Sequence, residues 1–374
     1  MKKKSPIKLV QVLGLMDSGG IESSVMNYFR NLNYNEFNVD FIVCEGSKLP
    51  QQEEIERIGG KIYIVPHYSH LFKYLREVRR IFKENKYDIV HAQMNALSIL
   101  PLYCAYKEKV KIRICHSHST TNNKEWKKNI LKNILKLFSK VFATDFFACS
   151  EHAGKWLYGK NIVNNKKFYI VNNAVDMDKF YFNNKIRDDI RKKLKVENNY
   201  VIGHIGRFML QKNHDFIIDV FFELKKEINN IKLILVGDGK LEKDIKNKVY
   251  SMNLEDDVIF IGATNRVQDY MNAMDLFVFP SLYEGLGMVA IEAQINNLYV
   301  IASKEVPIET KISNKIEFVN LKKELWKKCI VSLRDNRSKE FVKYDNYNFY
   351  DIKEQTRKME NKYKELINYE NYKR

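Results

Sequence analysis

The sequence lacks the cysteine patterns that hold small folds together. None of the five cysteines among its 374 residues forms a C-x-x-C pair, and several of them lie inside apolar runs. Zinc and disulfide frameworks are therefore not expected, and a reducing compartment fits this usage best.

Long apolar runs are missing too. No stretch of about 18 or more apolar residues occurs, so nothing is expected to span a membrane. The start, Met1-Lys-Lys-Lys-Ser-Pro6, resembles the basic part of a signal peptide, but Lys8 and Gln11 break the apolar part that follows, and no small-residue cleavage site appears. We expect a cytoplasmic protein.

The motifs of several enzyme classes are absent. The chain has no Walker loop, no Ser-His-Asp set, no context for a nucleophilic cysteine and no histidine cluster with metal spacing. A hydrolase or a kinase is therefore not supported. The motif G-x-G-x-x-G of dinucleotide-binding folds is also missing.

The composition that remains is apolar and basic. Hydrophobic residues make up 45% of the chain, and 63 basic against 46 acidic residues give a net charge of +17. The length suits about two domains. The charge suggests an anionic partner, which is a nucleic acid, an acidic membrane surface or a phosphorylated ligand. The lysines are spread along the chain, so part of the excess is compositional bias.

Strand-like and helix-like segments alternate along the whole chain, which predicts α/β domains with parallel sheets covered on both faces. We expect domains at 1–180 and 181–345, followed by an amphipathic helix over 351–367, within 346–374, that crosses back to the first domain. Expected strands are 7–15, 37–44, 61–65, 88–92, 111–115, 146–149, 168–171, a strand from 201, 232–236, 258–262, 276–279, 299–302 and 316–319. Among the helices between them, 95–107 contains Pro101, which should interrupt it. Residues 172–180 are expected to form a linker.

The stretch Phe277-Val-Phe-Pro-Ser-Leu-Tyr-Glu284-Gly-Leu-Gly-Met-Val-Ala-Ile-Glu292-Ala-Gln294 organises the second half. It predicts a buried strand, a glycine loop and a helix that runs to about residue 296. A helix N-terminus carries unpaired N–H groups and partial positive charge, so it attracts anions. Glu292 lies about two turns beyond Gly285 on the same face, where a carboxylate can accept two ribose hydroxyls. Glu284 precedes the helix and points at what the anion carries. Together these features describe a nucleotide-sugar site; the alternative is a surface loop and an ordinary helix.

Further polar residues follow other expected strands, at the edge where ligands bind in such folds. Arg207 and Lys212 follow a strand of the second domain and can neutralise a diphosphate and the charge that grows on it as it leaves. The turns Gly19-Gly20 and Gly237-Asp-Gly239 let the backbone approach a ligand, or are plain turns.

His116 and His118 form a polar cluster with Ser117, Ser119 and Thr120 after a first-domain strand. A histidine there can bind a sugar hydroxyl or help a proton move. A structural role remains the alternative, and His116 is favoured because it directly follows the expected strand.

In this order and spacing, eight short segments resemble the family 4 glycosyltransferases of GT-B fold, and within them the bacterial enzymes that build capsular and exopolysaccharides. The resemblance covers nearly the whole chain. The segments are Met16-Asp-Ser-Gly-Gly-Ile-Glu22, His116-Ser-His-Ser119, Ala148-Cys-Ser-Glu151, Asn173-Ala-Val-Asp176, Gly203-His-Ile-Gly-Arg-Phe208 with Gln211-Lys-Asn-His214, Val236-Gly-Asp-Gly239, Pro280-Ser-Leu-Tyr-Glu-Gly-Leu286 and Glu292-Ala-Gln294.

The resemblance implies two Rossmann-like domains and a retaining transfer, without metal or cofactor, from a nucleotide sugar, usually a UDP-sugar. It implies that the leaving phosphate helps to deprotonate the acceptor. It also implies diphosphate binding by Arg207 and Lys212, ribose binding by Glu292, donor-sugar binding by Glu284 with the backbone of Gly285 and Leu286, a place for Gly20 near the phosphates or the acceptor, and contact of a histidine of the His116 cluster with the donor sugar. We add Gly19, Gly20 and Gly237 to the donor-binding residues because their turns can approach a ligand, and we expect His116, His118 and Glu284 to be the catalytic residues.

The sequence departs from the family pattern at Asn296-Asn-Leu-Tyr299, where a glycine and a proline are usual, and this puts the helix end in doubt. The motif Asp176-Met-Asp178 holds a metal in other sugar-transfer enzymes, but it lies in the expected linker, so no metal site is expected. Acceptors in such pathways are lipid-diphosphate-linked sugars, and a basic helix over 70–86 could rest on anionic lipid at the inner membrane face.

Three other functions stay open. A nucleotide-sugar epimerase of the same fold would share the donor site. A nucleic-acid binder is suggested by the charge alone, without any recognised module, and no nucleic-acid partner is expected. A non-catalytic scaffold would not need Arg207, Lys212, Glu284 and Glu292 together.

Overall fold

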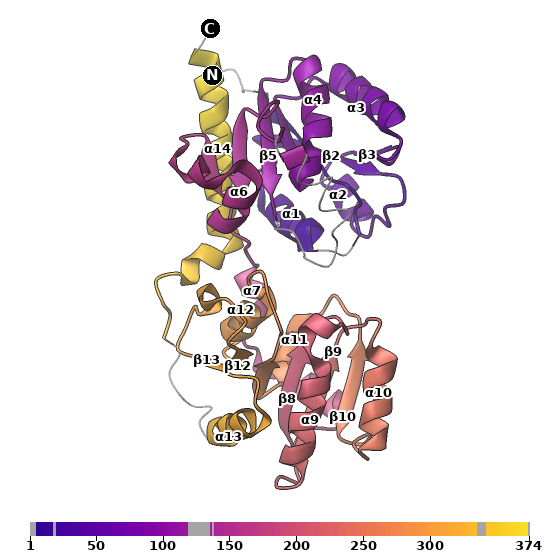
Figure 1. Cartoon of the computed structure of the whole chain (residues 1–374), viewed down its shortest axis with the longest axis vertical. Coiled ribbons are helices and arrows are strands. Elements are labelled where there is room, and N and C mark those ends of the chain that lie inside the picture. The colour runs from indigo at the N-terminus through magenta and orange to yellow at the C-terminus, as the bar shows by residue number, and fades with distance from the viewer. Residues whose placement is uncertain (1–4, 18–19, 119–134, 137, 335–341, 373–374) are drawn as a thin grey trace. The chain divides into compact units, whose positions relative to one another are not determined.

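The protein forms two compact units, each built around its own parallel sheet (Figure 1). The computed structural model describes residues 5–17, 20–118, 135–136, 138–334 and 342–372. Unit 1 comprises residues 1–175 and 349–374, and unit 2 comprises residues 176–348. The boundaries that we expected from the sequence were 180 and 345. Both sheets are parallel and flanked by helices, which confirms the predicted fold class.

The sheet of unit 1 has seven strands in the order β3-β2-β1-β4-β5-β6-β7. Most of its strands are runs rich in β-branched and aromatic residues, which suit a sheet buried on both faces. The strands are β1 (Ile7–Val12), β2 (Phe37–Cys44), β3 (Ile62–Val65), β4 (Ile89–Ala92), β5 (Ile112–Ser117), β6 (Asp145–Ala148) and β7 (Phe168–Ile170).

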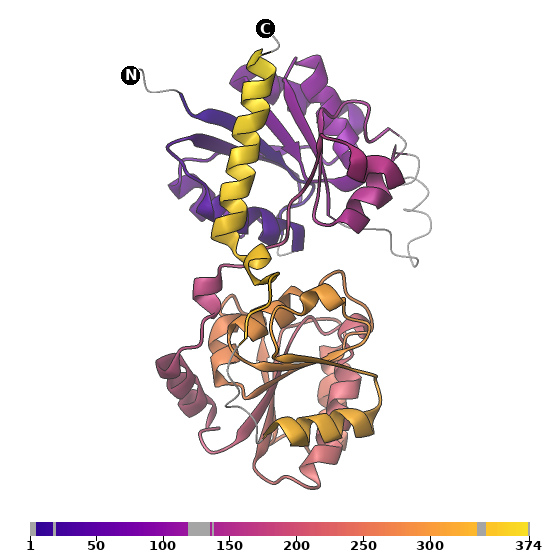
Figure 2. The same ribbon diagram turned by 90° about the vertical axis from the view of Figure 1, so that its left-hand side faces the viewer.

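Two sets of helices cover the faces of this sheet. One apolar core lies under α1 (Gly20–Asn31), α2 (Gln52–Arg57) and the C-terminal α14 (Ile352–Tyr372). The other lies under α3 (Leu71–Asn85), α4 (Ile99–Lys107) and α6 (Glu151–Tyr158). Figure 2 shows α14 lying along its face of the sheet. The last helix of the chain thus helps to build the core of the first unit.

The sheet of unit 2 has six strands in the order β10-β9-β8-β11-β12-β13. The strands are β8 (Tyr200–Ile205), β9 (Ile231–Val236), β10 (Val258–Gly262), β11 (Leu276–Phe279), β12 (Tyr299–Ser303) and β13 (Ile316–Val319). The helices are α7 (Met177–Phe180), α8 (Asn184–Leu194), α9 (His214–Lys225), α10 (Glu242–Ser251), α11 (Val267–Ala273), α12 (Met288–Ile295) and α13 (Lys323–Arg334). An apolar core joins the sheet to α9, α10 and α13.

Two local expectations were wrong. Pro101 does not interrupt its helix, because it lies in the first turn of α4, where no intrahelical N–H donor is needed; a short 3₁₀ turn (Asn95–Ser98) precedes that helix. Strand β5 runs on to Ser117, so His116 lies inside the strand rather than after it. The boundary between the two units falls inside the expected linker, which also contains the short helix α7 and the pairing of Val175 with Asp351.

The unusual end of α12 has a clear physical basis. The helix ends at Ile295, and Asn297 adopts a φ of 67°, the left-handed conformation in which glycine is usual. Asparagine tolerates that conformation better than other side chains. The Asn296 side chain donates to the carbonyl of Phe180 at 2.9 Å. Asparagine therefore replaces glycine here without disturbing the helix.

Candidate functional site

The carboxyl ends of β8 and β11 bring the first set of predicted residues together. The two strands are neighbours in the sheet of unit 2. Arg207 lies two residues after β8, Lys212 ends the following 3₁₀ turn (Leu210–Lys212), and Glu284 follows β11. Residues that are 72 apart in sequence thus meet at one edge of the sheet.

Lys212 and Glu284 form a buried ion pair. Lys212 Nζ lies 2.6 Å from Glu284 Oε1, and the two side chains are 16% and 8% exposed. Gln211 Nε2 donates to Glu284 Oε2 at 3.3 Å and to the Tyr283 carbonyl at 2.9 Å. The ammonium group also lies 4.8 Å from the centre of the Phe279 ring. Glu284 therefore neutralises Lys212 and holds it in one position.

Two buried histidines lie close to this pair. His204 Nδ1 is 2.8 Å from the Val278 carbonyl oxygen, and the His214 ring stacks on Phe208 at 4.1 Å. Burial and the charge of Lys212 lower the pKa of His214 to about 4, and burial, His214 and Lys212 lower the pKa of His204 well below its usual value. Both rings are therefore neutral at physiological pH and add no charge to the site.

Arg207 differs from Lys212 in its surroundings. Its side chain is exposed, and within the described part of the chain no ion pair or hydrogen bond reaches its guanidinium group. It stands at the carboxyl edge of the sheet, where an anion can approach it without breaking an existing ion pair.

Glu292 occupies the fifth position of α12 and is half-buried. Within the described residues no hydrogen bond or ion pair reaches its carboxyl group, and burial raises its pKa from 4.5 to about 7. Gln294, two positions on, is fully buried and makes hydrogen bonds to Ala290, Thr310, Ile312 and Ser313. Gln294 braces the helix, whereas Glu292 keeps its acceptor positions available.

Gly237 and Gly285 lie at this edge for different structural reasons. Gly237 has a φ of +136°, and a Cβ there would lie 2.2 Å from the carbonyl oxygen of Gly206, so the turn itself requires glycine. Gly285 has open space around it, and the next carbonyl, of Leu286, accepts from the Thr310 hydroxyl. Of the two, Gly285 is the one whose missing side chain leaves room for a ligand.

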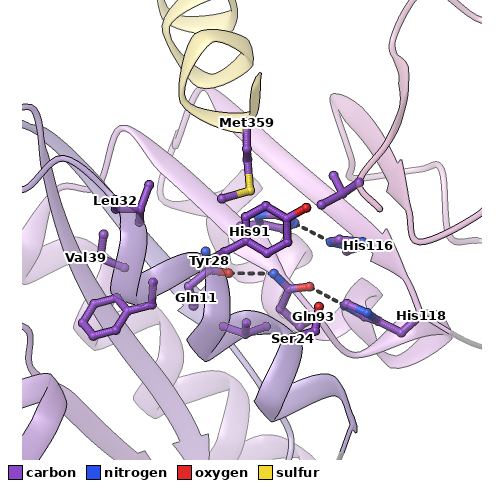
Figure 3. Close-up of a pocket in the computed structure, with 13 residues that line it drawn as sticks. Gln11, Ser24, Tyr28, Leu32, Val39, His91, Gln93, His116, His118 and Met359 are labelled. Atoms are coloured by element: carbon purple, nitrogen blue, oxygen red, sulfur yellow. Dashed lines mark hydrogen bonds between the residues drawn. The ribbon is translucent and has the colours of Figure 1, made fainter. Parts of the chain in front are cut away.

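The second set of predicted residues lies in unit 1, on the face of the sheet covered by α1 and α14. His116 and His118 stack at 4.0 Å between ring centres, and both line a cavity of about 20 Å³ (Figure 3). Gly20 begins α1 above this face, and Gly19 lies outside the described residues, as do Ser119 and Thr120.

Four further polar residues belong to this cluster, and sequence reasoning missed them. His91 Nε2 is 3.0 Å from His116 Nδ1, and His91 Nδ1 is 2.7 Å from the Tyr363 hydroxyl. His118 Nε2 is 2.5 Å from Gln93 Oε1, and Gln93 Nε2 donates to Gln11 Oε1 at 2.8 Å. Figure 3 shows the contact between His91 and His116 and the contacts that lead from His118 through Gln93 to Gln11.

A signal for three of them was present in the sequence. Gln11 follows Leu9, and both His91 and Gln93 follow Ile89 at a period of two, so each polar residue takes an inward position that would ordinarily be apolar. Nothing in the sequence pointed to Tyr363, because its partner His91 lies 272 residues away.

Burial keeps all three histidines of this cluster neutral. It lowers the pKa of His91 to about 3, that of His118 to about 4 and that of His116 well below its usual value. Neutral imidazole has one donor and one acceptor nitrogen, so each ring can pass on a hydrogen bond. The cluster is therefore a set of oriented neutral dipoles and not a positive patch.

Two features are absent from the described residues. Among them, no three or more histidine, cysteine, aspartate or glutamate side chains gather where they could hold a metal ion. No helix in that part of the chain combines the length and the apolar character that crossing a membrane requires.

Comparison with known proteins gives the family. The model "Glycosyltransferase Family 4" matches residues 18–179, and "Glycosyl transferases group 1" matches residues 185–319. The putative glycosyltransferase EpsF of Bacillus subtilis is 32% identical over 305 residues, which cover 80% of this chain and 79% of the relative. The capsular polysaccharide biosynthesis glycosyltransferase CapH of Staphylococcus aureus is 27% identical, with 96% and 98% covered.

Solved structures agree on the fold. The crystal structure of HepE from Anabaena, in complex with UDP and glucose, matches with a TM-score of 0.76 at 16% identity and covers 96% of this chain and 99% of its own. The predicted resemblance is thus confirmed across both units by sequence and by fold: the chain belongs to the family 4 glycosyltransferases of GT-B fold, and its relatives include an enzyme of capsular polysaccharide biosynthesis.

Proposed function

We propose that this glycosyltransferase moves a sugar from a UDP-sugar donor to a growing, lipid-linked surface polysaccharide, with retention of configuration. The observation that carries the donor assignment is the edge of unit 2. There, a carboxyl group without a partner among the described residues, a fixed ammonium and an exposed guanidinium stand at strand ends and on a helix that glycines precede.

Each part of that edge suits one part of a nucleotide sugar. Glu292 accepts the two ribose hydroxyls, and Arg207 with Lys212 binds the diphosphate. Glu284 binds the donor sugar together with the backbone of Gly285 and Leu286, and it also fixes Lys212 at 2.6 Å. Because this ion pair already exists in the protein, little reorganisation is needed when charge develops on the leaving diphosphate.

Uridine as the base is supported by the relatives. HepE was solved with UDP and with UDP-glucose, and a relative from Escherichia coli that is 26% identical over 319 residues is named as a UDP-galactose-dependent galactosyltransferase. The same name gives its acceptor as a diphosphoundecaprenol-linked sugar. We infer a lipid-linked acceptor for this chain on that basis.

We propose that the protein is cytoplasmic and binds the inner face of the cell membrane, and the surface of α3 supports this location. Phe72 is 88% exposed at the start of the helix, beside Lys73 and Arg76. Arg79 pairs with Glu108, and Arg80 pairs with two glutamates of its own helix, so these two arginines have protein partners. Lys73, Arg76 and Lys83 are exposed and have no ion pair within the described residues.

This surface can be tested with vesicles. Binding to vesicles that contain anionic lipid should weaken with salt, and it should weaken on replacing Lys73, Arg76 and Lys83 by glutamine. The matched control replaces Arg79 and Arg80, whose charges are already paired. Unchanged binding in the first variant would contradict the assignment.

We further propose that the transfer needs neither a cofactor nor a protein-bound metal. The donor edge has two basic residues, Arg207 and Lys212, and one of its two carboxylates, Glu284, is already paired with Lys212, which suits direct binding of the diphosphate by the protein. Turnover should therefore survive EDTA, and loss of activity that returns with Mg²⁺ or Mn²⁺ would count against this part.

The whole proposal is tested with a panel of nucleotide sugars. Donors are ranked by thermal shift, and those that bind are then assayed for sugar transfer to lipid extracts of polysaccharide-producing cells. Transfer from a UDP-sugar with the anomeric configuration of the donor supports the proposal. Epimerised free UDP-sugar in the absence of acceptor would instead identify an epimerase, and binding of random oligonucleotides in place of nucleotide sugars would refute the enzyme assignment.

A further inference from the structure

A large cavity in unit 1 contains none of the predicted site residues. It has a volume of about 850 Å³ and lies at the amino ends of three neighbouring strands. Ile112 and Asp145 begin β5 and β6, and Lys167 directly precedes β7. His118 follows the opposite end of β5, about 20 Å from Ile112 at the rise per residue of a strand. The volume suits a ligand pocket, for which about 300–1,000 Å³ is usual.

The walls of the cavity come from segments that are far apart in the sequence. Its buried part is the start of β5 and β6, and one side is the 3₁₀ turn Lys160–Asn164 with the loop that leads to β7. The other side is α14, whose cavity residues recur every three or four positions and therefore share one face of the helix. These helix residues are Lys362, Glu365, Leu366, Tyr369 and Glu370.

Asp145 is a buried polar residue of this cavity, and it is 6% exposed. Its Oδ2 accepts a hydrogen bond of 2.7 Å from the Thr144 hydroxyl, whereas no donor or cation among the described residues reaches its Oδ1. Burial raises the pKa of this carboxyl above its usual value, although Lys167 and Lys362 act in the opposite direction. A ligand that donates a hydrogen bond to Oδ1 would satisfy a buried acceptor.

The formal charges of the lining balance, which argues against an anionic ligand. The lining contains three lysines and three carboxylates, namely Lys166, Lys167 and Lys362 with Asp145, Glu365 and Glu370. Lys362 Nζ lies 3.0 Å from Glu365 Oε1, so one lysine already has a carboxylate partner. A phosphate group would meet the remaining carboxylates as well as the remaining lysines, and like charges that close repel each other. An uncharged ligand avoids this repulsion.

The rest of the lining combines polar groups of both kinds with apolar surface. The amide side chains of Asn161 and Asn164 can each donate and accept hydrogen bonds. Tyr369 is 54% exposed, and with Leu366 it gives the cavity an aromatic and aliphatic side. A sugar ring has the matching features, because its hydroxyl groups donate and accept around the rim and its faces carry C–H groups.

We propose that this cavity is a second saccharide site, which binds an uncharged oligosaccharide away from the place of sugar transfer. Asp145 and the asparagines bind hydroxyl groups, and Tyr369 covers the face of a sugar ring. No bond is made or broken there. The role of the site rests on the proposed function, because holding the polysaccharide at this edge would keep the enzyme on the polymer that it extends. The class of ligand follows from the lining alone.

The proposal is tested by titrating the full-length protein, in excess UDP, with uncharged trisaccharides. The panel contains trisaccharides of glucose, galactose, mannose, N-acetylglucosamine and N-acetylgalactosamine, and binding is followed by calorimetry and ligand-observed NMR. We expect at least one of them to bind. In Asp145→Asn its Kd should rise about tenfold, because a hydrogen bond to a charged acceptor is weakened. In Tyr369→Ala it should rise about three- to tenfold, because the ring contact is lost.

Each cavity variant has a matched control in the same unit. Asp40→Asn changes another buried carboxyl group of the sheet, which is 8% exposed and already accepts from the Lys61 backbone at 3.0 Å and the Tyr87 hydroxyl at 2.7 Å. Tyr106→Ala removes a tyrosine of α4 that is 52% exposed and does not line the cavity. Both controls should leave the Kd within about twofold of the unmodified protein.

Four results would overturn the proposal. They are no binding by any trisaccharide of the panel, unchanged binding in Asp145→Asn and Tyr369→Ala, equal weakening in cavity and control variants, and displacement of the bound trisaccharide by inorganic phosphate, which would show an anion site instead.

The same measurements separate this inference from the proposed function. If the protein uses no nucleotide sugar as donor but Asp145→Asn weakens trisaccharide binding, the transferase assignment fails and the second saccharide site stands. If transfer is found and no trisaccharide binds, the second site alone is wrong.

Discussion

Replacing Glu292 by glutamine tests the central claim about the donor site, because it removes a carboxyl group whose ionisation in the folded protein is destabilising. Burial raises the pKa of this carboxyl from 4.5 to about 7. The folded protein therefore binds a proton that the unfolded chain has already lost at any pH between these values. Since the folded-state pKa is the higher one, the stability of the protein falls as the pH rises from about 4.5 through 7.

The magnitude follows from the same values. Ionising the buried carboxyl costs about 3 kcal/mol at pH 8 and about 1 kcal/mol at pH 5, as upper values for a half-buried group. Glutamine has no such dependence on pH. We therefore expect Glu292→Gln to gain about 2 kcal/mol relative to the unmodified protein between pH 5 and pH 8. For a unit the size of residues 176–348, that gain corresponds to roughly 4–8 °C in Tm.

The measurement is a calorimetric scan of both proteins across this pH range, followed by titration with UDP at pH 8. Binding of UDP should weaken about tenfold or more in the variant, because a carboxylate that accepts hydroxyl groups is replaced by a neutral amide. A Tm difference that does not change with pH would refute the burial argument. Unchanged UDP affinity would refute the ribose assignment, whatever the calorimetry shows.

Two further substitutions probe the same edge of unit 2. Gly237→Ala places a Cβ 2.2 Å from the Gly206 carbonyl oxygen at a φ of +136°, so calorimetry should show a loss of about 2–3 kcal/mol. Gly285→Ala, which meets open space, is its control and should stay within about 0.5 kcal/mol; equal losses would contradict this account. Lys212→Met leaves the buried Glu284 carboxylate unpaired and should cost about 3–5 kcal/mol in chemical denaturation. Adding Glu284→Gln should restore most of that stability but not UDP binding, and a double variant as unstable as the single one would show that the ion pair is not the cause.

Most of the fold could be predicted because its signals are local. Strands such as 37–44, 258–262, 276–279 and 316–319 have the predicted bounds, since each is a short apolar run between polar residues or turns. The end of β5 was predicted wrongly because a long-range partner determines it. β5 extends to Ser117 because β6 continues beside it and pairs His116 with Phe147.

The same distinction between local signals and long-range partners holds for the candidate site. Arg207, Lys212 and Glu284 could be placed at strand ends, because a parallel α/β order puts those ends on one edge. The ion pair between Lys212 and Glu284 was not predicted, because it depends on β8 and β11 being neighbours, although residues 206–275 lie between them in sequence. The same is true of Tyr363, whose role in unit 1 depends on how α14 packs.

The charges of these two polar clusters show that the net charge of +17 is not what prepares the protein for its ligand. Lys212 is neutralised by Glu284, burial lowers the pKa of the histidines in these two clusters and keeps them neutral, and Glu292 has a pKa of about 7. What remains for an anionic ligand is the exposed Arg207 and the N–H groups at the start of α12. Because oriented dipoles and pre-formed pairs need little rearrangement when charge develops, we expect such an edge to favour the departure of the diphosphate of the proposed donor more than its initial attraction. The excess of basic residues therefore lies elsewhere on the protein. Binding to an anionic lipid surface, as proposed above, would account for the exposed basic residues of α3 beside Phe72.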